Sequence, residues 1–72
     1  MSMLGARVRE ERLRRDWSQT KVSGLTGIAA PDISAIERGT KYPFPGWRRR
    51  LAAAFRLSER ELFPGLEEER SR

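Results

Sequence analysis

The groups best suited to chemistry in this sequence are hydrogen-bond donors and cations, and they gather between residues 18 and 50. Ser18 and Gln19 bring a hydroxyl and an amide, which can bond a phosphate, a base edge or another side chain. Thr20 and Lys21 follow, and only one of them is expected on the same face. Further donors stand at Arg38, Thr40, Lys41 and in the run Arg48, Arg49 and Arg50. These residue types share an ability to bind the phosphates of a nucleic acid.

The composition argues against catalytic and metal chemistry. The 72 residues include no cysteine and no histidine, so thiolate zinc ligands and the usual general base near neutral pH are missing. The carboxylates of Glu10, Glu11 and residues 67–69 are expected on solvated faces or in the tail, without a partner base. We therefore expect a protein that is not an enzyme and that uses no metal, no cofactor and no small-molecule ligand.

The charge balance favours a nucleic-acid partner. Lysine and arginine total 15 against 10 aspartate and glutamate residues, for a net charge of +5 and a pI near 11.0. A basic balance is typical of nucleic-acid-binding proteins, although an arginine-rich solvated surface would give the same composition.

The chain length indicates one small core. Chains of this size bury about 60% of the surface that they expose when unfolded, which leaves little room for a hidden cavity. The longest apolar run is far shorter than the roughly 18 residues of a membrane span, and the N-terminus is charged where a signal peptide is apolar. We expect a cytoplasmic protein without a membrane partner, with one domain at residues 1–65 and a charged, flexible tail at 66–72.

Glycine and proline divide the chain into five segments with helical rather than alternating periodicity. The expected helices span about residues 3–15, 19–26, 30–38, 46–55 and 58–63. Ser18 is suited to cap the second helix, and Ser58 with Glu61 has the spacing of a capping box for the fifth. Gly27 and Gly39 are suited to end the second and third helices. The prediction is an all-α fold without strands.

Two charged residues fall on faces that are otherwise apolar. Arg12 continues the stripe that contains Val8, and Glu37 continues the stripe of Ile33 and Ile36. Opposite charges on two core stripes suggest one buried ion pair.

Other inward positions depend on less regular patterns. The second helix offers Val22 with either Leu25 or Thr26, while Leu13 lies beside the stripe of the first. The remaining expected core positions are Leu4, Ile28, Trp47, Leu51, Ala54 or Phe55, Leu57, Leu62 and Phe63.

The segments SQTKVSGL, TGIA and APDISAIERG describe two short helices joined by a glycine turn, and they resemble the helix-turn-helix family of the lambda Cro and phage-repressor type, also called XRE-like. LGARVREER at the start and LSERELF at the end extend the resemblance over about residues 3–63. It implies a compact five-helix, lambda-repressor-like domain from a bacterium, an archaeon or a phage. It also implies a sequence-specific transcriptional repressor that inserts helix 3 (about 30–38) into the major groove, as a homodimer on a palindromic operator. The family likewise pairs the positions of Arg12 and Glu37.

The positions that match the family's base readers depart from its usual glutamine, arginine, asparagine and serine. They are Ala30, Pro31, Asp32 and Ala35, with Ser34 between them. An alanine methyl can pack on a thymine methyl but makes no hydrogen bond. Asp32 can accept from cytosine N4, or it can simply be a first-turn acid favoured by the helix dipole. Direct base reading is therefore expected to be thin.

The resemblance leaves affinity to contacts with the DNA backbone and leaves one rival function open. The expected phosphate contacts are Ser18, Gln19, Thr20, Arg38, Thr40, Lys41 and one or two of the three arginines, with Arg48 among them. The alternative is a protein-interaction adaptor of the same fold that has lost base reading and binds through Tyr42 and Phe44 of the proline loop. Leu57, Leu62 and Phe63 are the apolar candidates for a dimer seam.

Overall fold

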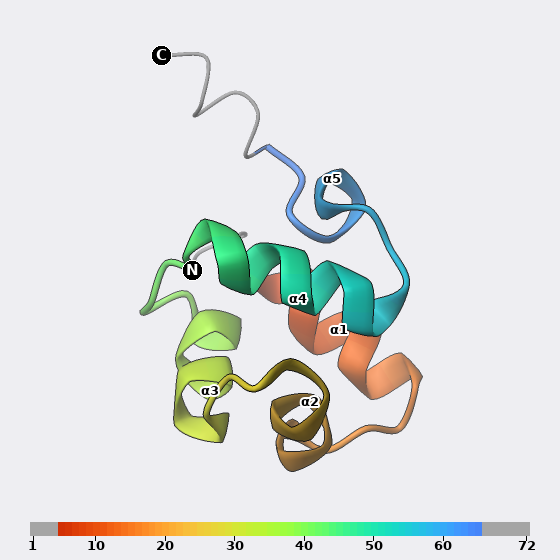
Figure 1. Cartoon of the computed structure of the whole chain (residues 1–72), viewed down its shortest axis with the longest axis vertical. Helices are drawn as coiled ribbons and strands as arrows, with labels where there is room; N and C mark the ends of the chain where they lie inside the picture. The colour runs from red at the N-terminus through yellow and green to blue at the C-terminus, as the bar shows by residue number, and fades with distance from the viewer. Residues whose placement is uncertain (1–4, 66–72) are drawn as a thin grey trace.

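The structure is a computed structural model, and it describes residues 5–65 of the chain. It contains five helices: α1 (Ala6–Arg14), α2 (Gln19–Thr26), α3 (Ala30–Arg38), α4 (Pro45–Phe55) and α5 (Glu59–Leu62) (Figure 1). No strand occurs between residues 5 and 65, so the predicted all-α fold is confirmed. Leu4 and the proposed tail at 66–72 lie outside the described residues.

The helix ends use the capping residues that the sequence predicts. Ser18 Oγ accepts a hydrogen bond of 2.9 Å from the backbone N–H of Lys21 at the start of α2. Gly27 has φ of 75°, a conformation that glycine adopts without steric cost, and ends that helix. In α5, Ser58 and Glu61 each accept from the other's backbone N–H, which completes the capping box. Because these contacts are local, they can be read from the sequence.

The first helix begins at Ala6, later than predicted, and the preceding Gly5 lies against α3. A Cβ atom on Gly5 would stand 1.7 Å from the carbonyl oxygen of Ile36, which no side chain could tolerate. Gly5 therefore permits the close approach of α1 to α3.

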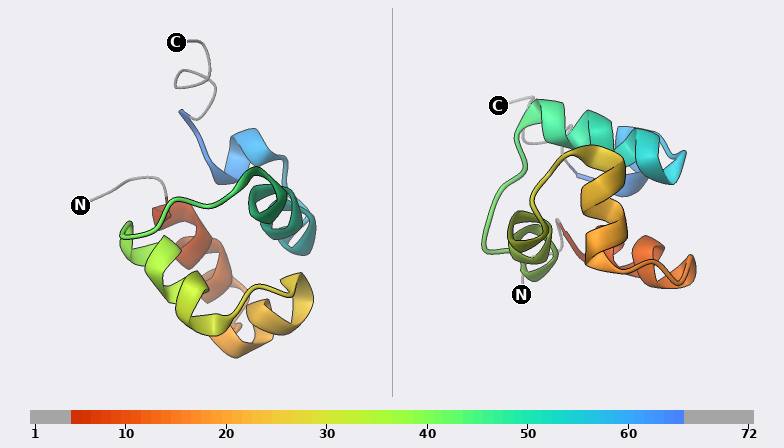
Figure 2. Two further views of the ribbon diagram at one scale, coloured as in Figure 1. Left: turned by 60° about the vertical axis from the view of Figure 1, so that its left-hand side comes forward. Right: turned by 60° about the horizontal axis from the view of Figure 1, so that its bottom comes forward.

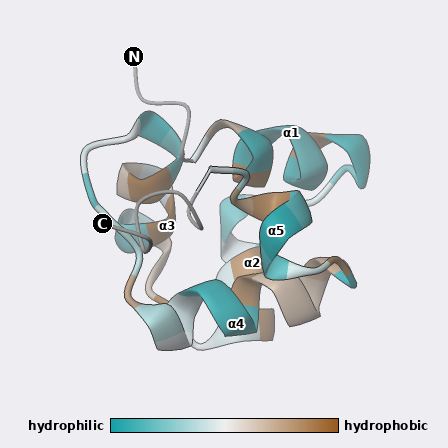
Figure 3. Ribbon diagram, turned by 90° about the horizontal axis from the view of Figure 1, so that it is seen from above, coloured by the Kyte–Doolittle hydropathy of each residue, from teal (hydrophilic) through white to brown (hydrophobic). Residues whose placement is uncertain are grey.

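The five helices surround one apolar core. α2 packs against both α3 and α4, while α1 packs against α3 and α4 (Figure 2). Figure 3 shows hydrophilic residues along α1, α4 and α5. The buried apolar residues are Val8, Val22, Ile28, Ile33, Ile36, Leu51, Ala52, Phe55, Leu62 and Phe63.

The structure decides between the core positions that the sequence left open. Leu13 is 51% exposed. Of the two alternatives in the second helix, Leu25 is 48% exposed and Thr26 is buried. The Thr26 hydroxyl donates to the Val22 carbonyl and accepts from the Ile28 N–H, which satisfies this polar group in the interior. Trp47 is only partly buried against the core.

The expected dimer seam also needs correction. Leu62 and Phe63 are 0% and 1% exposed within a single chain, because they close the core beneath α5. They are therefore unavailable to a second copy, and of the three candidates only the partly buried Leu57 keeps some exposure. None of the helices within residues 5–65 is long and apolar enough to cross a membrane.

Candidate nucleic-acid interface

A buried ion pair joins α1 to α3. Arg12 Nε lies 2.7 Å from Glu37 Oε2, and Arg12 Nη2 lies 3.0 Å from Oε1, so the contact is bidentate. Arg12 Nη1 also donates to the carbonyl oxygen of Trp17 at 2.9 Å. The hydrogen bond that Arg12 donates to Glu37 raises the pKa of Arg12, so the guanidinium stays charged although it is buried. This is the pair that the two stripes suggest.

Gln19 extends this pair to α2. Its Nε2 donates to Glu37 Oε1 at 3.2 Å, which links the first residue of α2 to the last turn of α3. Bonding to another side chain is one of the alternatives that the sequence leaves open for this amide. The half-buried Gln19 thus helps to set the relative position of α2 and α3. Its carbonyl oxygen and second amide hydrogen remain as hydrogen-bonding groups.

The start of α2 presents small polar groups to solvent. Ser18 and Thr20 are exposed, and Ser18 Oγ already serves as the cap. The N–H groups of a helix's first turn carry partial positive charge and suit an anion. Lys21 is also exposed, with its Nζ 6.0 Å from the ring centroid of Trp17.

The polar side chains of α3 are bonded within the chain. Asp32 Oδ1 lies 3.0 Å from Lys41 Nζ, so the one acid of the first turn has a cation beside it. Arg38 Nη1 donates to the Ser34 hydroxyl one turn earlier. Pro31 is exposed at the start of the helix, and the expected base readers Ala30 and Ala35 are half-buried.

The segment after α3 holds its two predicted contact residues in fixed places. Thr40 is exposed, and its hydroxyl donates to the Ala35 carbonyl at 3.2 Å beyond the helix end at Gly39. Lys41 lies between Asp32 and the face of Trp47, 5.3 Å from the ring centroid. An ammonium held against an aromatic face and a carboxylate loses some of its freedom.

Arg48 does not belong with the exposed cations, which corrects its place among the expected phosphate contacts. It is 5% exposed, and its Nη1 donates to the Pro43 carbonyl at 2.8 Å. Its Nε lies 3.9 Å from Glu59 Oε1. Arg48 precedes Leu51 and Phe55 at helical spacing. This spacing places Arg48 on the buried face of α4, although it belongs to a run of three arginines.

The neighbouring arginines behave differently. Arg49 and Arg50 are exposed. Arg50 Nη1 would stand 3.9 Å from a Cβ atom on Gly27, so this guanidinium reaches the turn between α2 and α3. Sequence reasoning left open which arginines share the surface of the helix pair, and Arg50 is the one that lies beside the turn.

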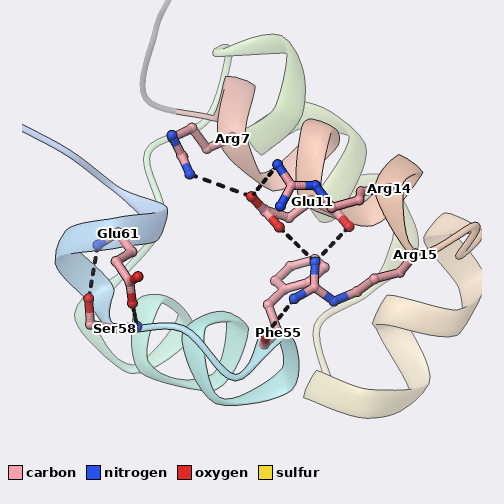
Figure 4. Close-up of polar contacts among 7 residues, drawn as sticks. All are labelled: Arg7, Glu11, Arg14, Arg15, Phe55, Ser58 and Glu61. Carbon is pink, nitrogen blue, oxygen red and sulfur yellow. Dashed lines mark hydrogen bonds and ion pairs between the residues drawn. The ribbon is translucent and has the colours of Figure 1, made fainter.

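A second buried carboxylate supports α1 (Figure 4). Glu11 was expected on a solvated face, but its side chain is 3% exposed and lies 3.5 Å from Arg7, 3.6 Å from Arg14 and 2.7 Å from Arg15. Arg15 Nη2 also donates to the Phe55 carbonyl at 2.7 Å, which ties α1 to the end of α4. The hydrogen bond from Arg15, more than the charges of the three arginines, lowers the pKa of Glu11.

Comparison with known proteins gives the same architecture. The restriction-modification controller protein C.AhdI from Aeromonas hydrophila is 32% identical, with a TM-score of 0.78 over 82% of this chain and 89% of its own. The P22 c2 repressor, solved with a synthetic operator, is 25% identical, with a TM-score of 0.83 over 90% of this chain and 98% of its own. SinR, solved in a complex with SinI, is 24% identical and shares the fold, with a TM-score of 0.81 over 93% of this chain and 66% of its own.

Comparison with protein families agrees with the likeness in structure, whereas comparison with individual curated proteins gives no match. The sequence profile of a family described as a helix-turn-helix domain matches residues 3–63, which is most of the chain. The chain, with its lambda-repressor-like fold, therefore belongs to the helix-turn-helix domain family.

Proposed function

We propose that this protein is a transcriptional repressor that binds double-stranded DNA with α3 in the major groove. The observation that carries the proposal is the α2–α3 unit, in which Gln19 bonds Glu37 and Arg12 of α1 holds the same carboxylate, while Thr20 and Pro31 in the first turns are exposed. The family match and the operator complex of the P22 c2 repressor support it. A helix held by such a turn can enter a groove whose width matches one helix.

The backbone contacts come from both ends of the unit. Ser18, Gln19 and Thr20 present the N-terminus of α2 to a phosphate. Arg38, Thr40 and Lys41 lie on the other side. There the exposed Arg50 replaces the buried Arg48 as the arginine that contacts a phosphate. Cations that neutralise phosphates release counterions, so the affinity falls steeply as the salt concentration rises.

Base reading by α3 rests on few contacts. Ala30, Pro31 and Ala35 offer apolar surface that suits thymine methyl groups. The Lys41 ammonium offsets the repulsion between Asp32 and the phosphates. Much of the discrimination between sites then comes from the shape of the DNA.

We also propose that residues 1–65 form the DNA-binding domain of a cytoplasmic protein that acts as a homodimer on a palindromic operator. One short helix with few base contacts gives little affinity, and two copies double the number of phosphates contacted. Since Leu62 and Phe63 are buried, the seam uses other residues.

Selection of binding sites from random duplex DNA, at low and at high salt, tests this function. We expect a palindromic motif whose binding weakens with salt, and Arg50→Ala should weaken binding across all selected sequences. Arg9→Ala, which removes an exposed arginine from α1, is the matched control. Recovery of no motif, with only salt-sensitive residual binding, would favour the adaptor, for which the 50% and 57% exposed Tyr42 and Phe44 are the contact candidates.

A further inference from the structure

A hollow lies at a corner of the molecule that the proposed function does not use. It forms where the C-terminal ends of α1 and α4 meet α2, has a volume of about 420 Å³ and opens to solvent. α2 lies between this corner and α3 (Figures 1 and 2). The residues that line the hollow include Arg15, Trp17, Lys21, Leu25, Phe55 and Arg56.

The floor of the hollow is aromatic, and Trp17 supplies its accessible ring because Phe55 beneath it is only 1% exposed. The rings of Trp17 and Phe55 stack with centroids 5.5 Å apart and an interplanar angle of 23°. Leu25 joins them in the lining, and its 48% exposure leaves apolar surface uncovered. A floor of this kind is suited to receive an apolar side chain from another molecule.

The rim of the hollow is basic. Arg15 is held in place by Glu11 and the Phe55 carbonyl, and its guanidinium stands 5.0 Å from the Phe55 ring centroid. Within residues 5–65, neither Lys21 nor Arg56 forms an ion pair with a carboxylate. Two cations beside the aromatic floor are therefore available to an anionic partner.

The backbone of Arg56 at this rim has a conformation that is uncommon for residues other than glycine. Arg56 ends α4 with φ of 59° and ψ of 41°, the left-handed conformation in which helices commonly place glycine. A non-glycine residue in this conformation costs free energy relative to glycine. Here the residue that bears this cost supplies a cation to the hollow.

We propose that the hollow binds an acidic segment of a partner polypeptide. One apolar side chain of the segment packs on Trp17 and Leu25, while flanking carboxylates pair with Lys21 and Arg56. The open shape suits a chain that continues past the hollow on both sides better than a small molecule that must be enclosed. DNA phosphates would meet the two cations but leave the aromatic floor uncovered.

Binding of a labelled synthetic peptide, in which one leucine stands between pairs of glutamates, tests the proposal. Arg56→Gly removes the cation and suits the left-handed backbone, so the variant keeps its fold. We expect Arg56→Gly and Lys21→Ala each to weaken fluorescence-anisotropy binding about three- to fivefold, as the loss of a partly exposed ion pair allows. In a Trp47→Phe background, the peptide should also shift the emission of Trp17.

Three controls decide between outcomes. Arg9→Ala should leave the affinity unchanged, and a peptide with glutamine in place of glutamate should not bind. A loss with Arg9→Ala as large as that with Arg56→Gly, or no detectable binding, would overturn the proposal. So would binding without a change in Trp17 emission. If Arg56→Gly and Lys21→Ala weaken binding to a random DNA duplex as much as binding to the peptide, the corner is a nucleic-acid surface instead.

Discussion

The two buried carboxylates of this domain, Glu37 of α3 and Glu11 of α1, are held in different ways. Glu37 makes a bidentate contact with Arg12, whose side chain is 9% exposed. Glu11 is shared by Arg7, Arg14 and Arg15, whose side chains are 42%, 73% and 26% exposed. The first pair is closed to water, whereas the second is a buried acid beneath solvated guanidinium groups.

The difference separates two uses of arginine in a basic protein. Arg12 and Arg48 are interior residues, because they bond Glu37 and a backbone carbonyl, respectively. Arg49 and Arg50 remain on the surface, where they can meet an external anion. The total of 15 lysine and arginine residues therefore overstates how many cations can meet an external anion, since Arg12 and Arg48 serve the fold.

The largest predicted effect comes from breaking the closed pair. Glu37→Ala leaves the Arg12 guanidinium buried without its partner, and we expect a loss of about 3–5 kcal/mol in the free energy of unfolding. Urea denaturation followed by circular dichroism measures it. The double variant Arg12→Met with Glu37→Leu should recover most of the loss, because no charge is left buried. A cost below about 1 kcal/mol for Glu37→Ala would show that water reaches the pair.

A smaller effect is expected from the open cluster. Glu11→Ala removes the shared carboxylate, but Arg7 and Arg14 can turn toward water, so the main loss is the hydrogen bond from Arg15. We expect a cost on the order of 1–2 kcal/mol by the same unfolding measurement. A cost equal to that of Glu37→Ala would remove the distinction between the two carboxylates.

Acid should weaken the cluster around Glu11, because the pKa of Glu11 is lowered in the folded protein from its ordinary value of 4.5. Because folding lowers this pKa, the unfolded chain binds the proton more tightly. The stabilisation is complete above about pH 4.5 and is lost as the pH falls through the lower folded value.

Urea midpoints measured between about pH 6 and pH 3 should fall more steeply for the wild type than for Glu11→Gln. Glu61 also has a lowered pKa, mainly through hydrogen bonds with Ser58, and both proteins retain those hydrogen bonds. The difference between the two curves therefore reports Glu11, and parallel curves would contradict the assignment.

The smallest effect concerns the link from α2 to the closed pair. Gln19→Ala removes one hydrogen bond to Glu37, while Arg12 still satisfies the carboxylate. We expect a cost of about 0.5–1.5 kcal/mol and weaker binding to a selected DNA site. Gln19→Glu would place a second carboxylate beside Glu37, and it should cost more than the alanine variant. Equal stability of all three proteins would show that this hydrogen bond does not hold α2.

Sequence reasoning succeeded where the signal was local. The order and approximate positions of the five helices, the Ser18 and Ser58 caps and the ends at Gly27 and Gly39 each depend on neighbouring residues. The structure has them, although the first helix begins later than predicted. Arg12 and Glu37 could also be found, because each interrupts an apolar stripe at regular spacing.

The missed residues depend on what lies opposite them. Glu11 and Arg48 occupy helix faces whose burial is set by a neighbouring helix or loop, so the same spacing is compatible with burial or exposure. The role of Gly5 does not follow from the sequence, because the requirement for glycine arises only where α1 meets the carbonyl oxygen of Ile36. Sequence reasoning offered several candidates for exposed cations, and the packing separated Arg50 from Arg48.

The sequence by itself determined the five helices, their caps, the helix-turn-helix family and the existence of one buried pair. Periodicity and capping act within a few residues, so they survive without knowledge of the fold. Tertiary structure alone decided which arginines remain on the surface, that Glu11 is buried, and that Trp17, Phe55 and Arg56 meet at one hollow. Those outcomes depend on contacts between helices distant in the chain, where small differences in packing decide whether water or protein surrounds a side chain.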